Sequence, residues 1–266
     1  MHPMVNIAVR AARSAGNVIT RYMDRLDTLT VETKGRNDFV SEVDRMAERE
    51  IIGVLRKAYP HHAIMGEETG TSGEDDEFQW IIDPLDGTTN FLYGVPHFAV
   101  SIALRHRGRL EVAVVYDPVR QELWTASRGN GAQLDGRRIR VTQRQDLNGA
   151  LLGTGFPHKA PQHIDAYLGM FKALSQLAAD IRRPGAAALD LAYVACGRYD
   201  GFWEIGLAPW DMAAGLLLVQ EAGGVVGDFT GGPGHFKSGN VVAGNPRIFA
   251  SIVREIQPYC TPQLLR

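Results

Sequence analysis

Two acidic residues, Asp83 and Asp86, stand three positions apart in the stretch WIIDPLDGTTNF, residues 80–91. The apolar run before them predicts a strand that ends in these two carboxylates, and Pro84 restricts the backbone so that both can turn toward one point. The carbonyl of Leu85 can add a third oxygen. An Asx-type turn would explain one Asp, but not two acids beside an apolar strand. The pattern therefore favours a cation site.

Small residues follow the second carboxylate of this stretch. Gly87 permits a tight turn. Thr88, Thr89 and Asn90 then present hydroxyl and backbone N–H groups at a predicted helix N-terminus. Such a terminus attracts phosphate, because its N–H groups have no partner within the helix. The motif thus combines a cation site with a phosphate site.

Two further acids extend the set: Glu67 in MGEET, after a short predicted strand, and Asp211 in PWDMAAG, where it opens an apolar helix. Alone, Asp211 is typical of a helix N-cap and Glu67 of a surface loop. Together with the Asp pair they form an all-oxygen ligand set that lacks His and Cys. Such a set favours Mg²⁺ or Mn²⁺ over zinc.

The elements that must position these acids begin with helices. Apolar residues at helical spacing in residues 1–23, interrupted by arginines, predict an amphipathic helix rather than a secretion signal. Ser41 and Asp44 are typical of a capping box that opens a second helix, which ends before Pro60. Residues 98–126 predict three strands in an antiparallel meander.

The second half of the chain alternates strands and helices without repeats or a linker. We expect one compact α+β layered unit over residues 1–266, with sub-domains at roughly 1–148 and 149–266. The predicted strands lie at 150–153, near 202, at 225 and at 241, and the predicted helices at 162–177, 186–196, 211–221 and after 246.

Composition and charge exclude several classes of protein. The net charge of -2 and the pI of about 6.4 give no broad positive field, so direct DNA binding is not expected. No apolar run reaches the ~20 residues that a membrane span requires. Cys196 and Cys260 are far apart, in apolar segments of predicted helix, which is typical of buried free thiols. We expect a cytoplasmic protein without a membrane anchor.

The motifs GEE, DPLDGTTNF and WDMAAG, in this order and spacing, resemble the signature of the inositol monophosphatase family. The likeness covers essentially the whole chain, and the long DPLDGTTNF motif is highly specific. It implies a five-layer αβαβα sandwich, as in the inositol monophosphatase and fructose-1,6-bisphosphatase superfamily. It also implies a homodimer, activation by two or three Mg²⁺ ions with Mn²⁺ able to substitute, and inhibition by Li⁺.

The resemblance also implies roles for matching positions. Thr88 and Glu67 would orient the attacking water, and Asp44 would hydrogen-bond Thr88, a role compatible with its place in a capping box. The N–H groups of Gly87 and Thr88 would neutralise phosphate oxygens, and no phosphoenzyme would form. The metal-binding groups would be Glu67, Asp83, the Leu85 carbonyl, Asp86 and Asp211.

For the polyol part of the substrate, the resemblance implies that Glu204 in FWEIG accepts hydrogen bonds from hydroxyl groups. It also implies that the turn Gly185, Ala186 and Ala187 lines the site. Pro184 departs from the family, since relatives often carry Ser or Thr there. The resemblance also places Lys34 near the metal site, where a solvated loop lysine is an equal alternative. Asp86, Gly87, Thr88 and Asp211 complete the predicted substrate contacts.

Two alternatives to an inositol phosphatase stay open. Metal chemistry does not separate this substrate from fructose 1,6-bisphosphate, 3'-phosphoadenosine 5'-phosphate or histidinol phosphate. The likeness is also to a bacterial branch of the family that serves as a non-enzymatic subunit of ribosomal-RNA transcription antitermination complexes, with Nus factors and RNA polymerase as partners. The acidic pI favours contact with protein first. Because the metal ligands are all present, catalysis ranks above a purely binding role.

Overall fold

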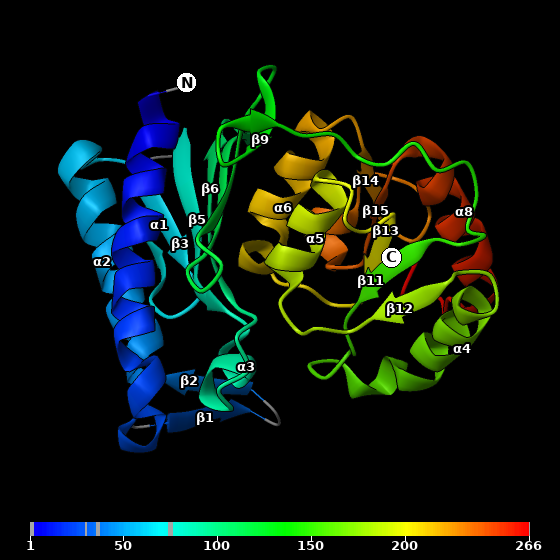
Figure 1. The fold of residues 1–266 in the computed structure, drawn as a ribbon, viewed down its shortest axis with the longest axis horizontal. Helices are drawn as coiled ribbons and strands as arrows, with labels where there is room; N and C mark the ends of the chain where they lie inside the picture. Colours follow the sequence, from blue (N-terminus) through cyan, green and yellow to red (C-terminus); the bar gives the residue numbers. More distant parts are fainter. Residues whose placement is uncertain (1–2, 30, 36–37, 74–76, 266) are drawn as a thin grey trace.

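Five layers of helix and sheet make up the structure, a computed structural model that describes residues 3–29, 31–35, 38–73 and 77–265. From left to right in Figure 1 they are a helix pair, a large sheet, a second helix pair, a small sheet and a third helix pair. The predicted αβαβα sandwich is confirmed. None of the helices in the described ranges is long and apolar enough to span a membrane.

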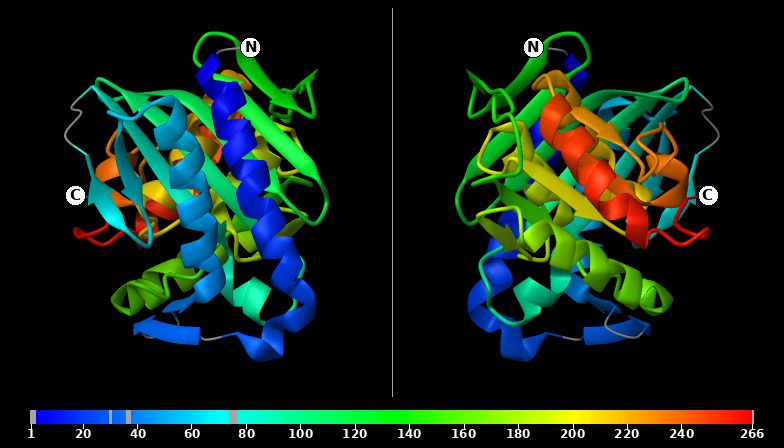
Figure 2. Two further views of the ribbon diagram at one scale, coloured as in Figure 1. Left: turned by 90° about the vertical axis from the view of Figure 1, so that its left-hand side faces the viewer. Right: turned by 90° about the vertical axis from the view of Figure 1, so that its right-hand side faces the viewer.

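The first helix pair covers the outer face of the large sheet, where its two members lie side by side (Figure 2). Their close packing follows from a stripe of buried alanines in the first helix. The capping box predicted at Ser41 and Asp44 is confirmed, and the second helix ends at Ala58, before Pro60 as predicted. The six longer helices are α1 (Pro3–Tyr22), α2 (Glu42–Ala58), α4 (Ile164–Ser175), α5 (Ala187–Ala195), α6 (Pro209–Glu221) and α8 (Pro246–Ile256).

The large sheet has eight strands in the order β10-β9-β8-β7-β6-β5-β3-β4. All neighbours are antiparallel except β3 and β5, which run parallel. The predicted meander is confirmed as β6, β7 and β8. The bounds are β3 (Ala63–Gly66), β4 (Gly70–Ser72), β5 (Phe78–Asp86), β6 (Ala99–His106), β7 (Arg109–Asp117), β8 (Glu122–Ser127), β9 (Gly131–Leu134) and β10 (Arg137–Arg138).

The predicted strand that carries the acidic pair, β5, continues through Asp83 and ends at Asp86. Its register against β6 shifts between these two residues. Pro84 explains the shift, because it has no N–H to donate to the ladder and sheets admit it at bulges. The bulge separates the two carboxylates along a single buried strand.

The small sheet has five strands in the order β12-β11-β13-β15-β14. Because β11 and β13 are parallel, their carboxyl ends lie at the same edge. This edge therefore carries both Glu204 and the loop that begins at Gly155. The bounds are β11 (Leu151–Thr154), β12 (Asp180–Arg182), β13 (Gly201–Glu204), β14 (Val225–Gly227) and β15 (Val241–Gly244).

The central helices α5 and α6 lie between the two sheets and are buried on nearly every face. That position explains why their sequences are apolar all round rather than amphipathic. The prediction that α6 begins at Asp211 is wrong by two residues. Pro209 is its first residue, a position where the missing N–H of proline costs no hydrogen bond.

Several short elements carry too little apolar pattern to be predicted. They are β9, β10, β12, the hairpin of β1 (Val31–Gly35) and β2 (Asp38–Ser41), and the short helices α3 (Thr88–Leu92) and α7 (His235–Ser238), of which only α3 has a predicted start. Lys34 falls in β1, but its side chain lies outside the described residues.

The two cysteines are free thiols, as predicted, but each is half-buried rather than buried and neither lies inside a helix. Cys196 directly follows α5, and Cys260 follows the short 3-10 turn Gln257–Tyr259.

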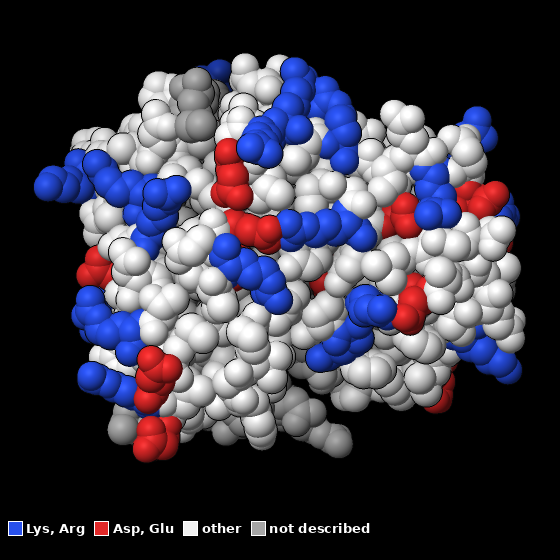
Figure 3. Space-filling view, viewed as in Figure 1, with Lys and Arg blue, Asp and Glu red and all other residues white. Residues whose placement is uncertain are grey.

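Charged side chains are interspersed on the face shown in Figure 3, where acidic groups lie among the lysines and arginines. Ion pairs such as Arg120 with Asp117 and Arg128 with Glu111 join neighbouring opposite charges. This distribution agrees with the small net charge of the chain.

Candidate active site

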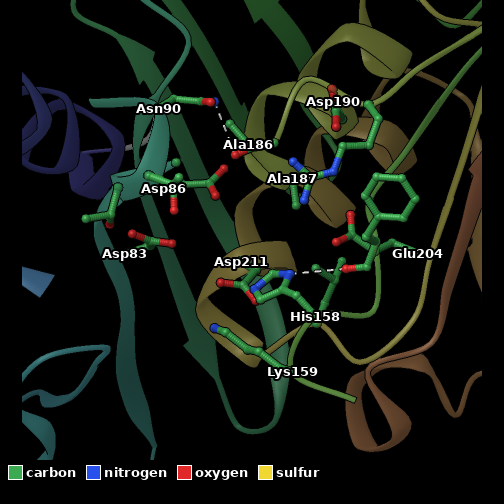
Figure 4. A pocket seen from close by; sticks show the side chains of 18 of the residues that line it. Asp83, Asp86, Asn90, His158, Lys159, Ala186, Ala187, Asp190, Glu204 and Asp211 are labelled. Carbon is green, nitrogen blue, oxygen red and sulfur yellow. Dashed lines mark hydrogen bonds between the residues drawn. The ribbon is translucent and has the colours of Figure 1, made fainter. Parts of the chain in front are cut away.

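A cavity of about 540 Å³ opens between the large sheet and the carboxyl edge of the small sheet. Figure 4 shows acidic side chains from β5, α5, α6 and β13 around it. Asp44 is the one predicted site residue with a described side chain that does not line the cavity, and it lies behind Thr88. The predicted residues in its lining are Glu67, Asp83, Leu85, Asp86, Gly87, Thr88, Gly185, Ala186, Ala187, Glu204 and Asp211.

The acids of this cavity repel one another. Burial raises the pKa of Asp83 well above its usual range, and the charges of Glu67, Asp86 and Asp211 raise it further. The pKa of Asp86 is raised in the same way, first by burial and then by Asp211. A bound cation would relieve both the burial cost and the repulsion.

The donor set fits magnesium. It consists of oxygen atoms, which Mg²⁺ prefers. In the described part of the chain, no three acidic, histidine or cysteine side chains converge on one point as a closed metal shell would. Mg²⁺ usually keeps several of its water ligands when it binds a protein. Carboxylates spaced around an open cavity leave room for those waters, so they suit Mg²⁺ better than an ion whose ligands all come from the protein.

Three of the acids are held by backbone N–H groups. An oxygen of Asp83 accepts from the Leu85 N–H at 3.0 Å, so the Asx-type turn is present as well. An oxygen of Asp211 accepts from the Ala208 N–H at 2.7 Å, so Asp211 is the third residue of α6 and bonds back to the N-cap residue rather than being the N-cap itself. An oxygen of Asp86 accepts from the Ala188 N–H at 2.7 Å. These bonds fix the carboxylates before any ion binds.

Thr88 is oriented from behind by α2. Its hydroxyl lies 2.8 Å from an oxygen of Asp44 and 3.0 Å from the Leu85 carbonyl, and can donate to either. The other oxygen of Asp44 accepts from the N–H and hydroxyl of Ser41, at 2.8 and 2.5 Å. Asp44 therefore caps α2 and orients Thr88 at the same time.

Asn90 joins the motif to the opposite wall. Its amide nitrogen donates to the His97 carbonyl at 2.8 Å and to the Pro184 carbonyl at 2.9 Å. Proline supplies a carbonyl like any residue, so the departure at Pro184 leaves this contact intact. Gly185 follows with a φ of +91°, a conformation that favours glycine. The sequence predicts that Asn90 lies at the start of a helix, but it does not predict these two hydrogen bonds to distant carbonyls.

Glu204 ends β13 and is buried beside the acids. Burial raises its pKa to about 8, together with the charges of Asp211 and Asp86, while Arg183 and Lys159 lower it. Its neighbours in the cavity thus include basic as well as acidic side chains.

Four acidic or basic residues of the lining were not predicted from the sequence: His158, Lys159, Arg183 and Asp190. Asp190 is fully buried in α5, and one of its oxygens has no hydrogen-bond partner within the described residues. A lone acid in the apolar run ALDLAYVA was the available signal, because unpaired acids are rarely buried. Lys159 could have been found only from the parallel pairing of β11 and β13.

These pKa shifts predict that the metal-free protein loses stability as the pH rises from about 5 to about 9. Because the pKa of Glu204 is raised from 4.5 to about 8, the folded state holds this proton more tightly than the unfolded state. The stabilisation is full below pH 4.5 and is lost as the pH passes 8, with a slope of at most about 1.4 kcal/mol per pH unit for each group. Thermal unfolding in EDTA should show this fall.

Saturating Mg²⁺ should flatten the dependence, and Glu204→Gln should make it shallower in EDTA. A melting temperature in EDTA that rises over this pH range would contradict the electrostatic description of the cavity.

Comparison with known proteins identifies relatives of the whole chain. The sequence profile of the Inositol monophosphatase family matches residues 1–260. The chain is 61% identical to Nus factor SuhB of Pseudomonas aeruginosa over 271 residues, covering 100% of both proteins.

Two solved structures share the fold. The extragenic suppressor protein suhB from Bartonella henselae has 45% identity and a TM-score of 0.93, with coverage of 96% of this chain and 98% of that one. The inositol monophosphatase from Anabaena has 38% identity and a TM-score of 0.86, with coverage of 96% and 95%. The likeness therefore includes both sheets and the segments that line the cavity between them.

Proposed function

Because the chain belongs to the inositol monophosphatase family, we propose that it is a Mg²⁺-dependent phosphomonoesterase that converts myo-inositol monophosphate to myo-inositol and phosphate. One observation carries the proposal: a single cavity brings together the acids of β5 and α6, the start of α3 and the buried Glu204. Metal, phosphate and polyol would each have a neighbouring set of partners.

Glu67, Asp83, Asp86, Asp211 and the Leu85 carbonyl would hold the metal, with two or three ions as the proposed number. When bound, Mg²⁺ would lower the pKa of a water and neutralise the charge of the leaving alkoxide. The protein's contribution is the fixed orientation of its carboxylates, set by the backbone bonds to Asp83, Asp86 and Asp211.

Thr88 and Glu67 would hold the attacking water. When the Thr88 hydroxyl donates its hydrogen to Asp44, its oxygen keeps lone pairs that accept a hydrogen bond from the water. As that water is deprotonated, Thr88 can take its proton and pass its own to Asp44. Burial raises the pKa of Asp44, which favours the protonated form, although hydrogen bonds from Ser41 and Thr88 oppose this. Asp44 would thus serve as the end of a short proton path.

The phosphate would lie at the start of α3. Gly87 has a φ of +93°, a left-handed conformation that favours glycine, and the backbone N–H groups there would stabilise oxygens that gain charge. The displacement would be in line, with water and alkoxide on opposite sides of phosphorus. Gly185 and Ala186 would border the polyol, and Glu204 would accept hydrogen bonds from its hydroxyl groups.

A second function is favoured by the relatives. The protein of P. aeruginosa, 61% identical over its whole length, is named a Nus factor. We propose that this chain also joins a transcription antitermination complex through a surface away from the cavity, with Nus factors or RNA polymerase as partners. By likeness to the family, we further propose a homodimer and inhibition by Li⁺.

A panel of phosphomonoesters tests the enzymatic proposal. With Mg²⁺ we expect inositol 1-phosphate to be hydrolysed with a kcat/KM at least ~10-fold above those for fructose 1,6-bisphosphate, 3'-phosphoadenosine 5'-phosphate and histidinol phosphate, a factor that equals about 1.4 kcal/mol of selective binding. Excess EDTA should abolish hydrolysis, and added Mg²⁺ or Mn²⁺ should restore it. A different preferred ester would correct the substrate, and turnover that is unchanged in EDTA would refute the metal mechanism.

A further inference from the structure

Helix α2 presents two buried acids to the region of the cavity. Asp44 and Glu48 lie one turn apart on the same face, and the side chains of both are fully buried. Asp44 orients Thr88. Glu48 has no part in the proposed chemistry and does not line the cavity.

Glu48 holds the chain where it leaves β3. Its carboxylate accepts a hydrogen bond from the Glu68 N–H at 3.1 Å. The preceding N–H, that of Glu67, donates to the Ile82 carbonyl at 3.2 Å, one residue before Asp83. The successive N–H groups of Glu67 and Glu68 are thus held by hydrogen bonds to β5 and to α2. The Cα atom that carries the Glu67 side chain lies between these two N–H groups in the chain.

Gly66 leaves room for this approach. A Cβ at position 66 would lie 2.1 Å from the bonded oxygen of Glu48 and 2.8 Å from its carboxyl carbon. Any other side chain at this position would therefore displace the carboxylate. In the sequence MGEET, Gly66 directly precedes the two glutamates. The small size of Gly66 therefore allows the contact between Glu48 and the Glu68 N–H.

The second oxygen of Glu48 has no hydrogen-bond partner within the described ranges, although it is buried. A buried carboxylate with an unpaired oxygen contributes less to stability than a well-packed apolar side chain of similar size would. Stability alone is therefore a poor explanation for an acid at this position.

We propose that Glu48 is a positioning residue that fixes the Glu67 segment so that Glu67 can bind a divalent cation. This inference rests on the proposed metal-dependent function. It assigns α2 two tasks at one site: Asp44 orients the hydroxyl of Thr88, and Glu48 orients the backbone that carries Glu67.

Binding of Mn²⁺ alone tests the inference, with free ion measured by electron paramagnetic resonance and folding checked by circular dichroism and thermal unfolding. Glu48→Gln keeps an oxygen that accepts from Glu68, so its Kd for Mn²⁺ should stay within about 3-fold of the parent value. Glu48→Ala removes the acceptor and should raise that Kd by about 10-fold or more, as loss of an outer partner of a metal ligand does.

Gly66→Ala provides an independent variant, because it keeps the acid and moves it. Its Kd for Mn²⁺ should rise as in Glu48→Ala. Gly53→Ala is the matched control, since an added Cβ there, on α2, meets no atom within 4 Å. It should bind Mn²⁺ like the parent.

Parental Mn²⁺ affinity in folded Glu48→Ala or folded Gly66→Ala would overturn the inference, because Glu48 would then act on stability alone. An equal loss in Glu48→Gln and Glu48→Ala would also overturn it, because the acceptor would not be the cause. A parent protein that binds no Mn²⁺ would refute the proposed function together with the inference, and this result is visible before any variant is compared.

Discussion

Asp83→Asn should yield a folded protein with at least ~100-fold lower phosphatase activity at saturating Mg²⁺, because a neutral amide cannot balance the charge of a divalent ion. The fold should persist, since the amide oxygen of Asn can accept the Leu85 N–H that the carboxylate accepts now. Without metal, the variant should be at least as stable as the parent, because a neutral amide avoids the burial cost and the repulsion that raise the pKa of Asp83. Initial rates over a Mg²⁺ titration and thermal unfolding in EDTA measure these effects.

Asp165→Asn is the control for the change of an acid to an amide, because Asp165 lies exposed in the first turn of α4, outside the cavity. It should retain parental turnover. Asp83→Asn should also bind its Nus-factor partner as the parent does, measured by co-purification, if that surface lies outside the cavity. Near-parental turnover of Asp83→Asn would refute the metal assignment, and loss of partner binding in the folded variant would place both functions at one site.

Glu204→Gln should lower kcat/KM for inositol 1-phosphate by roughly 10- to 150-fold, the equivalent of about 1.5 to 3 kcal/mol for one hydrogen bond to a charged acceptor. Glu204 would be ionised in the working enzyme, because a bound cation offsets the burial and the charges of Asp211 and Asp86 that together raise its pKa to about 8. The ring hydroxyls of inositol could then donate to it.

A substrate without ring hydroxyls separates polyol recognition from catalysis. With p-nitrophenyl phosphate, Glu204→Gln should retain near-parental rates, because Thr88 and the metal-binding acids are unchanged. An equal loss with both substrates would instead make Glu204 part of the metal-binding set. No loss with either would make it a structural residue at the end of β13.

Gly155 offers a second way to move the same carboxylate. A Cβ at position 155 would lie 2.0 Å from an oxygen of Glu204 and 2.3 Å from its carboxyl carbon. Gly155→Ala should therefore reproduce the selective loss with inositol 1-phosphate, while Gly53→Ala should leave both substrates unaffected.

The parts of the site that could be predicted from the sequence are those formed by residues close together in the chain. The motif around Asp83 and Asp86 combines acids, a glycine and hydroxyls within a few positions, and the structure places these residues along one side of a cavity. The layered fold was likewise predictable, because motifs spread along the whole chain match one family. The capping box at Ser41 follows from spacing alone.

The parts that escaped prediction depend on contacts between distant segments. Glu48 sits in a helix with the pattern of any amphipathic helix, and its contact with Glu68 depends on how α2 lies on the sheet. Lys159 comes from a loop whose place depends on the pairing of β11 with β13. The bulge at Pro84 also depends on a distant segment, because it shows only in the register of β5 against β6.

The bond from the Ala188 N–H to Asp86 joins residues 102 positions apart. A growing chain is synthesised from its N-terminus at about 5 to 20 residues per second, so Asp86 leaves the ribosome roughly 5 to 20 seconds before Ala188. During that interval the acids of β5 have only one wall of the cavity beside them. Catalytic competence would therefore arise late in synthesis, after α5 and α6 have emerged, and a ribosome-bound chain that stops before Asp211 should hydrolyse no phosphate ester.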